Sequence, residues 1–199
     1  ASTANYNVAV GYKSGEAVTT GIYNTLIGGL AGDALTDADL NVAVGQGALT
    51  TDTKGSKSTA IGYGALSAQN FTTSTDSHNT AVGYEAGVAI TTGQYNVALG
   101  SLAGNGITEG AANVAIGYHS QGNNDLGSHN VSVGHGSLET LNPATATDMY
   151  NTGVGSLAGN AITTGINNTL IGAKAGDALT IGGSNVAVGF EALSTDVGG

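Results

Sequence analysis

A five-residue string repeats along the chain, and this repeat limits what the chain can fold into. The string NVAVG begins at Asn7, Asn41 and Asn185, and near-copies such as NTLIG, NTAVG and NVALG stand between them. Three short intervals are followed by one longer interval, so the pattern of starts recurs from position 7 to 79 and from 79 to 151, here called the long period. Short fixed periods of this kind are typical of solenoid proteins. The eleven copies begin at positions 7, 24, 41, 58, 79, 96, 113, 130, 151, 168 and 185.

Each position of the pentad predicts a structural role. The fifth residue is always Gly, the fourth is always Val, Ile or Leu, and the second is Val or Thr, both β-branched. In a strand, the second and fourth side chains share one face and the others share the opposite face. Both faces carry apolar or small residues, so we expect the strand to be buried on both. The leading Asn, replaced once by Ser58, can hydrogen-bond to the Asn one coil away. The structural repeat residues are Asn7, Gly11, Asn24, Gly28, Asn41, Gly45, Asn79, Gly83, Asn96, Gly100, Asn113, Gly117, Asn130, Gly134, Asn151, Gly155, Asn168, Gly172, Asn185 and Gly189.

The residues between the pentads favour a thin β-structure. At the third position after each pentad Gly the chain has only Ala or Ser, which indicates tight packing between coils or between chains. Glycine makes up 34 of 199 residues and no helical period is present, and glycine disfavours helices. We predict an all-β fold in which residues 1–199 form one domain. This domain is a parallel β-solenoid, or β-roll, of about eleven 17–21-residue coils.

The predicted coil is too thin to bury much of its own surface. The chain has no Trp, two Phe and eight Tyr, so few large side chains are available for a core. Neighbouring copies would supply the missing burial, and cyclic homo-oligomers are the usual solution. We therefore expect a homotrimer.

The charge balance excludes several classes of partner. Lys13, Lys54, Lys57 and Lys174 are the only basic residues apart from histidine, and the net charge is −10. Nucleic-acid binding requires basic side chains, so no nucleic-acid partner is expected. The chain has no Cys and no apolar run of about 18 residues, so neither disulfides nor membrane insertion of this segment is expected. It begins with Ala and lacks a signal-peptide pattern, which indicates a mature product or an excised piece.

The repeat string N-[VT]-A-[VI]-G-x-x-[AS] resembles the head repeats of trimeric autotransporter adhesins. It is also similar to repeat arrays of phage tail fibres and bacterial fibre proteins that carry endosialidase-type chaperone domains. The segment NTAVGYEAGVAITTGQYN, from Asn79 to Asn96, shows the pattern best, and the likeness covers essentially the whole chain. The resemblance implies a left-handed, trimeric β-roll at a cell or virion surface. The short coil of this chain is longer than the adhesin repeat of about 14 residues.

Motifs for catalysis and metal binding are missing from the sequence. No G-x-S-x-G, P-loop, H-E-x-x-H or C-x-x-C is present, so we predict no enzyme activity, cofactor or metal site. The string DADLN, beginning at Asp37, has the spacing of the first calcium ligands of an EF-hand but lacks its later Gly and acid. His78 and His129 precede pentads, where they either stack at a corner or form an ion site on a trimer axis. Scattered carboxylates, notably Asp33, Asp52, Asp177 and Asp196, are interpreted as solvated turns.

Binding candidates lie in the two long coils, which begin at Ser58 and Asn130. Insertions in solenoids often mark a binding face, and plain loop drift is the alternative interpretation. These coils hold one of the two Phe, the only Pro and the only Met, and the candidate residues are Asn70, Phe71, Asn142, Pro143 and Met149. A second candidate is the aromatic set that follows the pentad glycines, which either packs at a corner or forms a sugar-binding strip: Tyr12, Tyr63, Tyr84, Tyr118 and Phe190.

These features favour a structural and adhesive fibre segment that presents loops to a glycan or protein receptor outside the cell. One alternative is a filament subunit that assembles end to end, because a junction from Asn185 to the next copy's Asn7 would match the length of the long coils. Another is an ice-binding solenoid, although the Thr ranks are interrupted by Val. A polysaccharide-degrading solenoid would require an acidic cleft, which the sequence does not indicate.

Overall fold

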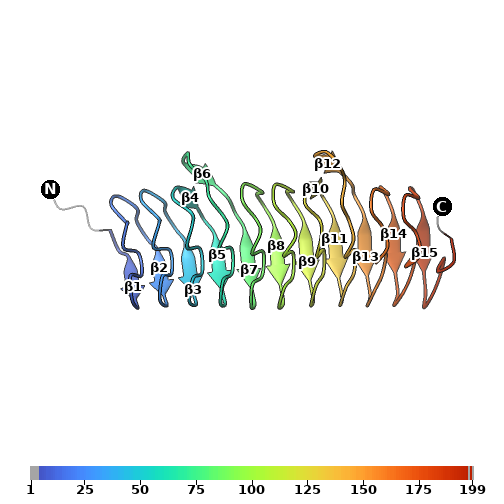
Figure 1. The fold of residues 1–199 in the computed structure, drawn as a ribbon, viewed down its shortest axis with the longest axis horizontal. Helices are drawn as coiled ribbons and strands as arrows, with labels where there is room; N and C mark the ends of the chain where they lie inside the picture. The colour runs from blue at the N-terminus through green and yellow to red at the C-terminus, as the bar shows by residue number, and fades with distance from the viewer. Residues whose placement is uncertain (1–4, 197, 199) are drawn as a thin grey trace.

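The computed structural model describes residues 5–196 and residue 198, and these form a straight rod of stacked coils (Figure 1). Each coil, here called a rung, begins at one pentad, and the rungs are numbered 1 to 11 along the chain. The described residues contain strands and turns but no helix. The predicted all-β parallel solenoid of about eleven coils is therefore confirmed.

Each rung contributes one three-residue strand to a single parallel sheet. The strand order is β1-β2-β3-β5-β7-β8-β9-β11-β13-β14-β15, so each rung pairs with the rungs before and after it. The register is kept from pentad to pentad, as Thr59 pairs with Thr80 and Ala60 with Ala81 across a long coil. The strands are β1 (Val8–Val10), β2 (Thr25–Ile27), β3 (Val42–Val44), β5 (Thr59–Ile61), β7 (Thr80–Val82), β8 (Val97–Leu99), β9 (Val114–Ile116), β11 (Val131–Val133), β13 (Thr152–Val154), β14 (Thr169–Ile171) and β15 (Val186–Val188).

Two short parallel pairs form at the long coils. β4 (Gly55–Ser56) pairs with β6 (Thr75–Asp76), and β10 (Gly127–Ser128) pairs with β12 (Thr147–Asp148). Both pairs rise from the same long edge of the rod (Figure 1), and the sequence places them four rungs apart. The insertions therefore project in one direction, as the long period requires.

The pentad glycines occupy a backbone conformation and a space that exclude other residues. Gly45 has a φ of 136°, in the region that favours glycine. A Cβ at Gly45 would lie 2.3 Å from the carbonyl oxygen of Gly62 in the next rung. The same close approach recurs along the sheet, for example between Gly83 and Gly100. The invariant Gly thus follows from the distance between stacked backbones.

The buried Asn residues connect consecutive rungs through hydrogen bonds between side chain and backbone. The backbone N–H of Asn96 donates to Oδ1 of Asn79 at 2.9 Å, and Asn96 Nδ2 donates to the carbonyl of Gly110 at 2.8 Å. The predicted Asn ladder therefore exists, but its main link joins a side chain to a backbone N–H. In three rungs Nδ2 also donates to the preceding Asn Oδ1, and the donors are Asn130, Asn168 and Asn185.

The pentad strand is buried on one face only in the single chain. The third pentad residue points inward, and Leu26, Ala43 and Ala60 are essentially inaccessible to solvent. The second and fourth residues point outward and are half-buried or exposed, as in Val82 and Ile171. The expectation that both faces are buried is thus wrong for one copy of the chain, because the outward side chains have no layer above them.

Two types of rung fill the core in different ways. In Gly-type rungs (1, 2, 5, 6, 9 and 10) the fourth residue after the pentad Gly is Gly and the seventh is Val, Leu or Ile, as in Gly87 and Ile90. In Leu-type rungs (3, 4, 7, 8 and 11) the fourth is Leu or Gln and the seventh is polar except in rung 8, as in Leu49 and Asp52. Ile90 and Leu49 are both fully buried. Most rungs are thus filled by one side chain from either of two positions, whereas rung 8 buries both Leu138 and Leu141.

Candidate functional site

The first candidate site consists of the two insertions, where the structure buries most of the predicted binding residues. Phe71, Pro143 and Met149 are buried, Asn70 is half-buried, and only Asn142 is exposed. The Phe71 ring covers Gly55, where a Cβ would lie 2.8 Å from it. The exposed crests of the insertions are instead Thr72, Thr73 and Ser74 in one, and Ala144, Thr145 and Ala146 in the other.

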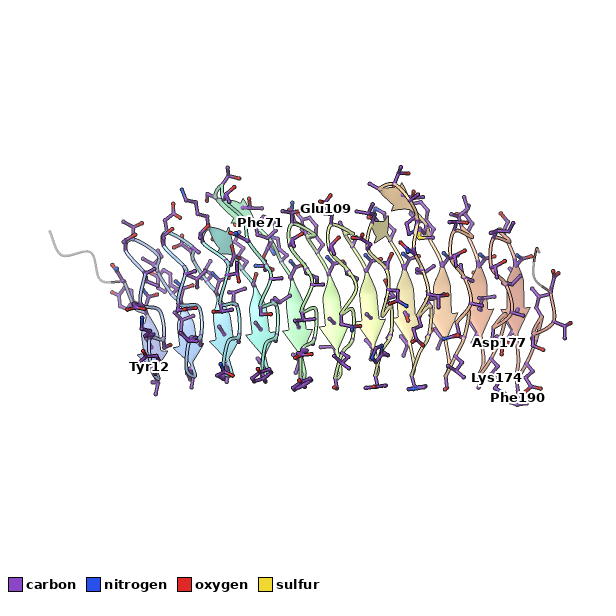
Figure 2. The ribbon with its side chains drawn as sticks, viewed as in Figure 1. Tyr12, Phe71, Glu109, Lys174, Asp177 and Phe190 are labelled. Carbon is purple, nitrogen blue, oxygen red and sulfur yellow. The ribbon has the colours of Figure 1, made fainter. Side chains whose placement is uncertain are left out.

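Met149 fills the equivalent space in the second insertion. A Cβ at Gly127 would lie 2.6 Å from the Met149 sulfur. Gly127 is the counterpart of Gly55 in the long period, whereas Met149 and Phe71 do not correspond in sequence. Two different side chains from different positions therefore close the same gap at the base of each insertion. Figure 2 shows Phe71 at this edge of the rod.

The polar groups below the first insertion are satisfied within the chain. Asp52 is fully buried, and its Oδ1 accepts hydrogen bonds from the backbone N–H groups of Gly55 and Phe71, each at 3.0 Å. Gln69 Nε2 donates to Asp52 Oδ2 at 2.5 Å and to Ser58 Oγ at 2.8 Å. The interpretation of Asp52 as a solvated turn residue is therefore wrong, because this carboxylate anchors the inserted segment from inside the rod.

The outer face of the sheet forms the second candidate site, here called the outer strip. It consists of the second and fourth residues of every pentad, all of which are Val, Thr, Ile or Leu. Val82, Val131 and Ile171 are 37%, 37% and 42% exposed, and Val186 at one end of the rod is 75% exposed. A continuous uncharged surface along the whole length of a rod marks an interaction site.

Two columns of residues border the outer strip. The corner column contains the residue before each pentad, and the flank column contains the residue after each pentad Gly. All eight tyrosines lie in these columns, and each is at least 50% exposed. Lys57 is the only Lys, Asp or Glu in either column. Aromatic enrichment together with depletion of charge is the composition of protein interfaces.

The aromatic rings within each column stack along the rod. Ring centroids lie 5.4 Å apart between Tyr63 and Tyr84, with nearly parallel planes. In the corner column, His78 stacks on Tyr95, and the ring of His129 lies 5.1 Å from that of the next corner residue. Within one chain, both histidines are thus stacked corner residues.

One tyrosine of the flank column has a raised pKa. A hydrogen bond between the Tyr84 hydroxyl and the Glu85 carboxylate raises the pKa of Tyr84, and the negative charge of Glu85 raises it further.

In the described part of the chain, no three His, Cys, Asp or Glu side chains lie close enough to hold a metal ion together. Residues 5–196 and 198 also contain no helix that could cross a bilayer.

The fold and its surfaces define a parallel β-solenoid repeat protein with an uncharged outer face. Comparison with protein-family models, with curated proteins and with solved structures found no match. The function of the chain must therefore be inferred from its own surfaces.

Proposed function

We propose that the chain is a rigid segment of an extracellular fibre, in which three copies pack around a common axis through the outer strip. The carrying observation is the outer strip itself, which has no charged residue on any of its eleven strands. Stacked rungs about 4.8 Å apart make this surface about 50 Å long, and the span between the two columns makes it about 20 Å wide. The resulting area of roughly 1,000 Å² is similar to the ~800 Å² that each partner contributes to a stable interface.

A three-fold arrangement would bury the outer strip of every copy. Three copies with their rods parallel would turn all three outer strips toward one axis and remove them from water. The Tyr and His columns would then meet the columns of neighbouring copies at the rim of the shared core. Such an assembly is a left-handed trimeric β-roll in this proposal, and it leaves the insertion edge of each copy free. The exposed crests would present Thr72 to Ser74 and Ala144 to Ala146 to a cell-surface receptor.

Molar mass in solution tests the assembly. One chain has a mass of 19.3 kDa, and light scattering is expected to give about three times that value. Val97→Asp together with Ile116→Asp places charge on the outer strip and is expected to yield a monomer or an insoluble protein. Thr92→Asp, at an exposed residue outside the outer strip, is the matched control and should leave the mass unchanged. A monomeric wild type would overturn the proposal.

A second candidate function, a filament built end to end, is favoured by complementary residues on the first and last rungs. In the flank column, Tyr12 is 73% exposed and Phe190 is 72% exposed, and Figure 2 shows them at the same long edge. In the next column, Lys174 Nζ lies 3.5 Å from Glu191 Oε1, and a stacked copy would place its Lys13 beside Glu191. Electron microscopy should then show filaments that Lys13→Glu abolishes and that added Glu191→Lys restores.

A further inference from the structure

A groove crosses rungs 2 to 5 on the side of the flank column that faces away from the outer strip. It has a volume of about 270 Å³ and is lined by Gln46, Gly47, Thr50, Tyr63, Ser67 and Glu85, among others. None of its lining residues belongs to the outer strip. The groove therefore remains at the rim of the proposed trimer interface, with Tyr63 as its wall on that side.

Two glycines in consecutive rungs create the groove. The second residue after the pentad Gly is usually a large residue with a positive φ, such as Leu30 (φ 58°) or Glu85 (φ 50°). In rungs 3 and 4 it is Gly47 and Gly64. A Cβ at Gly47 would meet nothing within 4 Å. Since other rungs place large residues in this conformation and no atom crowds Gly47, the missing side chains simply leave an open space.

The related rungs of the next long period lack this space. There the same column holds His119 and Gly136. A Cβ at Gly136 would lie 2.9 Å from both the Glu139 carboxylate and a Leu157 methyl group, so side chains already occupy the site. The fold repeats without repeating the groove. Stacking of rungs alone therefore does not account for it.

The groups around the groove match a small, neutral, polyhydroxylated ligand. Gln46 provides an amide donor and acceptor, Ser67 a hydroxyl, and Glu85 a carboxylate acceptor, which together suit a ligand with several adjacent hydroxyl groups. The Thr50 hydroxyl donates a hydrogen bond to Asp33 Oδ1 at 2.6 Å, so its oxygen lone pairs remain available to accept hydrogen bonds from a ligand. Tyr63 stacks on the next tyrosine with one ring face and adds aromatic surface to the wall. A few placed polar groups beside apolar and aromatic walls are typical of small-molecule sites.

Charge narrows the class of ligand further. Among the described residues, Glu85 is the only charged one that lines the groove, and the chain as a whole has a net charge of −10. Phosphorylated, sulfated and acidic sugars would be repelled. The volume is slightly below the ~300 Å³ at which drug-sized pockets begin, so one sugar ring is a suitable occupant.

We infer that this groove is a binding site for a neutral hexose unit of a glycan. The inference deepens the proposed fibre function and rests on it, because it assigns a ligand class to the adhesive role. One site per chain would be weak, and three sites on a trimer would bind a surface glycan by avidity.

The test measures binding of free sugars and of a polymer to the full-length chain. Saturation-transfer NMR is run with glucose, galactose, mannose and N-acetylglucosamine, with glucuronate as the acidic comparison, and retention is measured on dextran and galactomannan resins. We expect contact with at least one neutral sugar and none with glucuronate. Gly47→Leu and Gly64→Leu fill the groove and should each reduce binding at least tenfold, whereas Gly136→Leu, in the same column, should retain it.

Further readouts keep the test decisive. Circular dichroism and light scattering on each variant report folding and trimer mass, and Gln46→Ala with Tyr63→Ala tests the groove without adding bulk. Absence of neutral-sugar binding in a folded trimer would overturn the groove site and leave the fibre assembly standing. Binding that persists in the filled variants would likewise overturn it. A monomeric protein that still binds sugar through Gln46 would instead reject the trimer and retain the site.

Discussion

The Gly-type and Leu-type rungs share one backbone path but differ in where their bulk is placed. In rung 5 the core is filled by Ile90, and a Cβ at Gly87 would lie 3.0 Å from the Ile90 side chain. In rung 3 the core is filled by Leu49, and the position equivalent to Ile90 holds the hydrogen-bonded Asp52. The two arrangements are alternative solutions to the same packing problem, and rung 8 combines them by burying both Leu138 and Leu141, with Gly153 of the next rung against Leu138. Only Leu-type rungs carry the insertions and the two glycines that open the groove.

The largest expected effect lies in the part that both rung types share. Gly45→Ala in a Leu-type rung and Gly83→Ala in a Gly-type rung should each lower the free energy of unfolding by about 4 kcal/mol, because both add strain and a backbone clash. Gly47→Ala, two residues away in open space, should cost only about 1 kcal/mol for its left-handed conformation. Urea denaturation measures all three. Unequal losses at Gly45 and Gly83 would show that the sheet differs between rung types.

The second prediction separates packing from ligand binding in the insertions. Phe71→Ala should cost about 3 kcal/mol, and Met149→Ala a similar amount, because each vacates the gap above a glycine. Thr73→Ala on the exposed crest, the control, should change stability by less than about 0.5 kcal/mol. Thermal unfolding measures the losses. A Phe71→Ala protein of unchanged stability would return this residue to the list of ligand contacts.

The third prediction converts one rung type into the other. In rung 7, Asn124→Leu alone should overpack the core against Gln121, and Gln121→Gly alone should leave a cavity. The double variant reproduces the Gly-type pair and should recover about 1–2 kcal/mol relative to the sum of the single changes. A double-mutant cycle by urea denaturation measures this coupling. Simple additivity would mean that the two positions do not share the core space.

A milder change probes the buried carboxylate. Asn124 is the counterpart of Asp52 in the next long period, and it accepts from the Gly127 N–H at 3.0 Å, as Asp52 does from Gly55. Asp52→Asn keeps the acceptor for the backbone N–H groups but loses the hydrogen bond from Gln69 Nε2, so it should cost about 1–2 kcal/mol. Asp52→Ala leaves two backbone donors unpaired and should cost more. Calorimetric melting temperatures rank the two variants, and an Asn variant as unstable as the Ala variant would contradict the equivalence.

The smallest expected effect concerns the pKa of Tyr84. In rung 5 Tyr84 is followed by Glu85, whereas Tyr63 in the Leu-type rung 4 is followed by Gly64. The pKa of Tyr84 is raised by Glu85, so Tyr84 should ionise at a higher pH than an ordinary tyrosine. Because the folded state holds this proton more tightly, the small stabilisation is present below the ordinary tyrosine pKa of about 10 and is lost as pH rises through the raised value. Ultraviolet titration of Tyr84→Phe against wild type measures it, and Glu85→Gln should reduce the shift.

The sequence predicted the strands well because their causes are local and repeated. The pentad glycines and the Asn ladder follow from alternation and rung spacing, as at Gly45, whereas burial of the third position alone, as at Ala60, was not predicted because both faces of the strand carry apolar or small residues. The two rung types also leave a signal in the sequence. A small residue followed three positions later by a large apolar one, as in Gly87 and Ile90, alternates with the reverse order, as in Leu49 and Asp52. That signal is a correlation between positions, which a search for identical strings does not detect.

The binding residues are harder to predict because the rarity of a residue type in the chain does not distinguish a ligand contact from a packing contact. Phe71 and Met149 are uncommon in this chain, but each fills a gap that only the three-dimensional stacking of Gly55 and Gly127 creates. The groove was missed for the opposite reason. It depends on side chains that two glycines lack, and absent side chains among 34 glycines give little signal.

The four-rung period fixes the axial distance between the two insertions. The two crests lie at the same edge four rungs apart, about 19 Å along the axis, and of their exposed residues the central Thr, Thr73 and Thr145, is common to both. A target that displays its recognition units at this spacing could engage both crests of one copy without bending the protein, whereas a target with another repeat length could engage only one. The number of rungs between the crests thus sets their axial separation. Adding or removing a single short coil there would change this separation by about 4.8 Å.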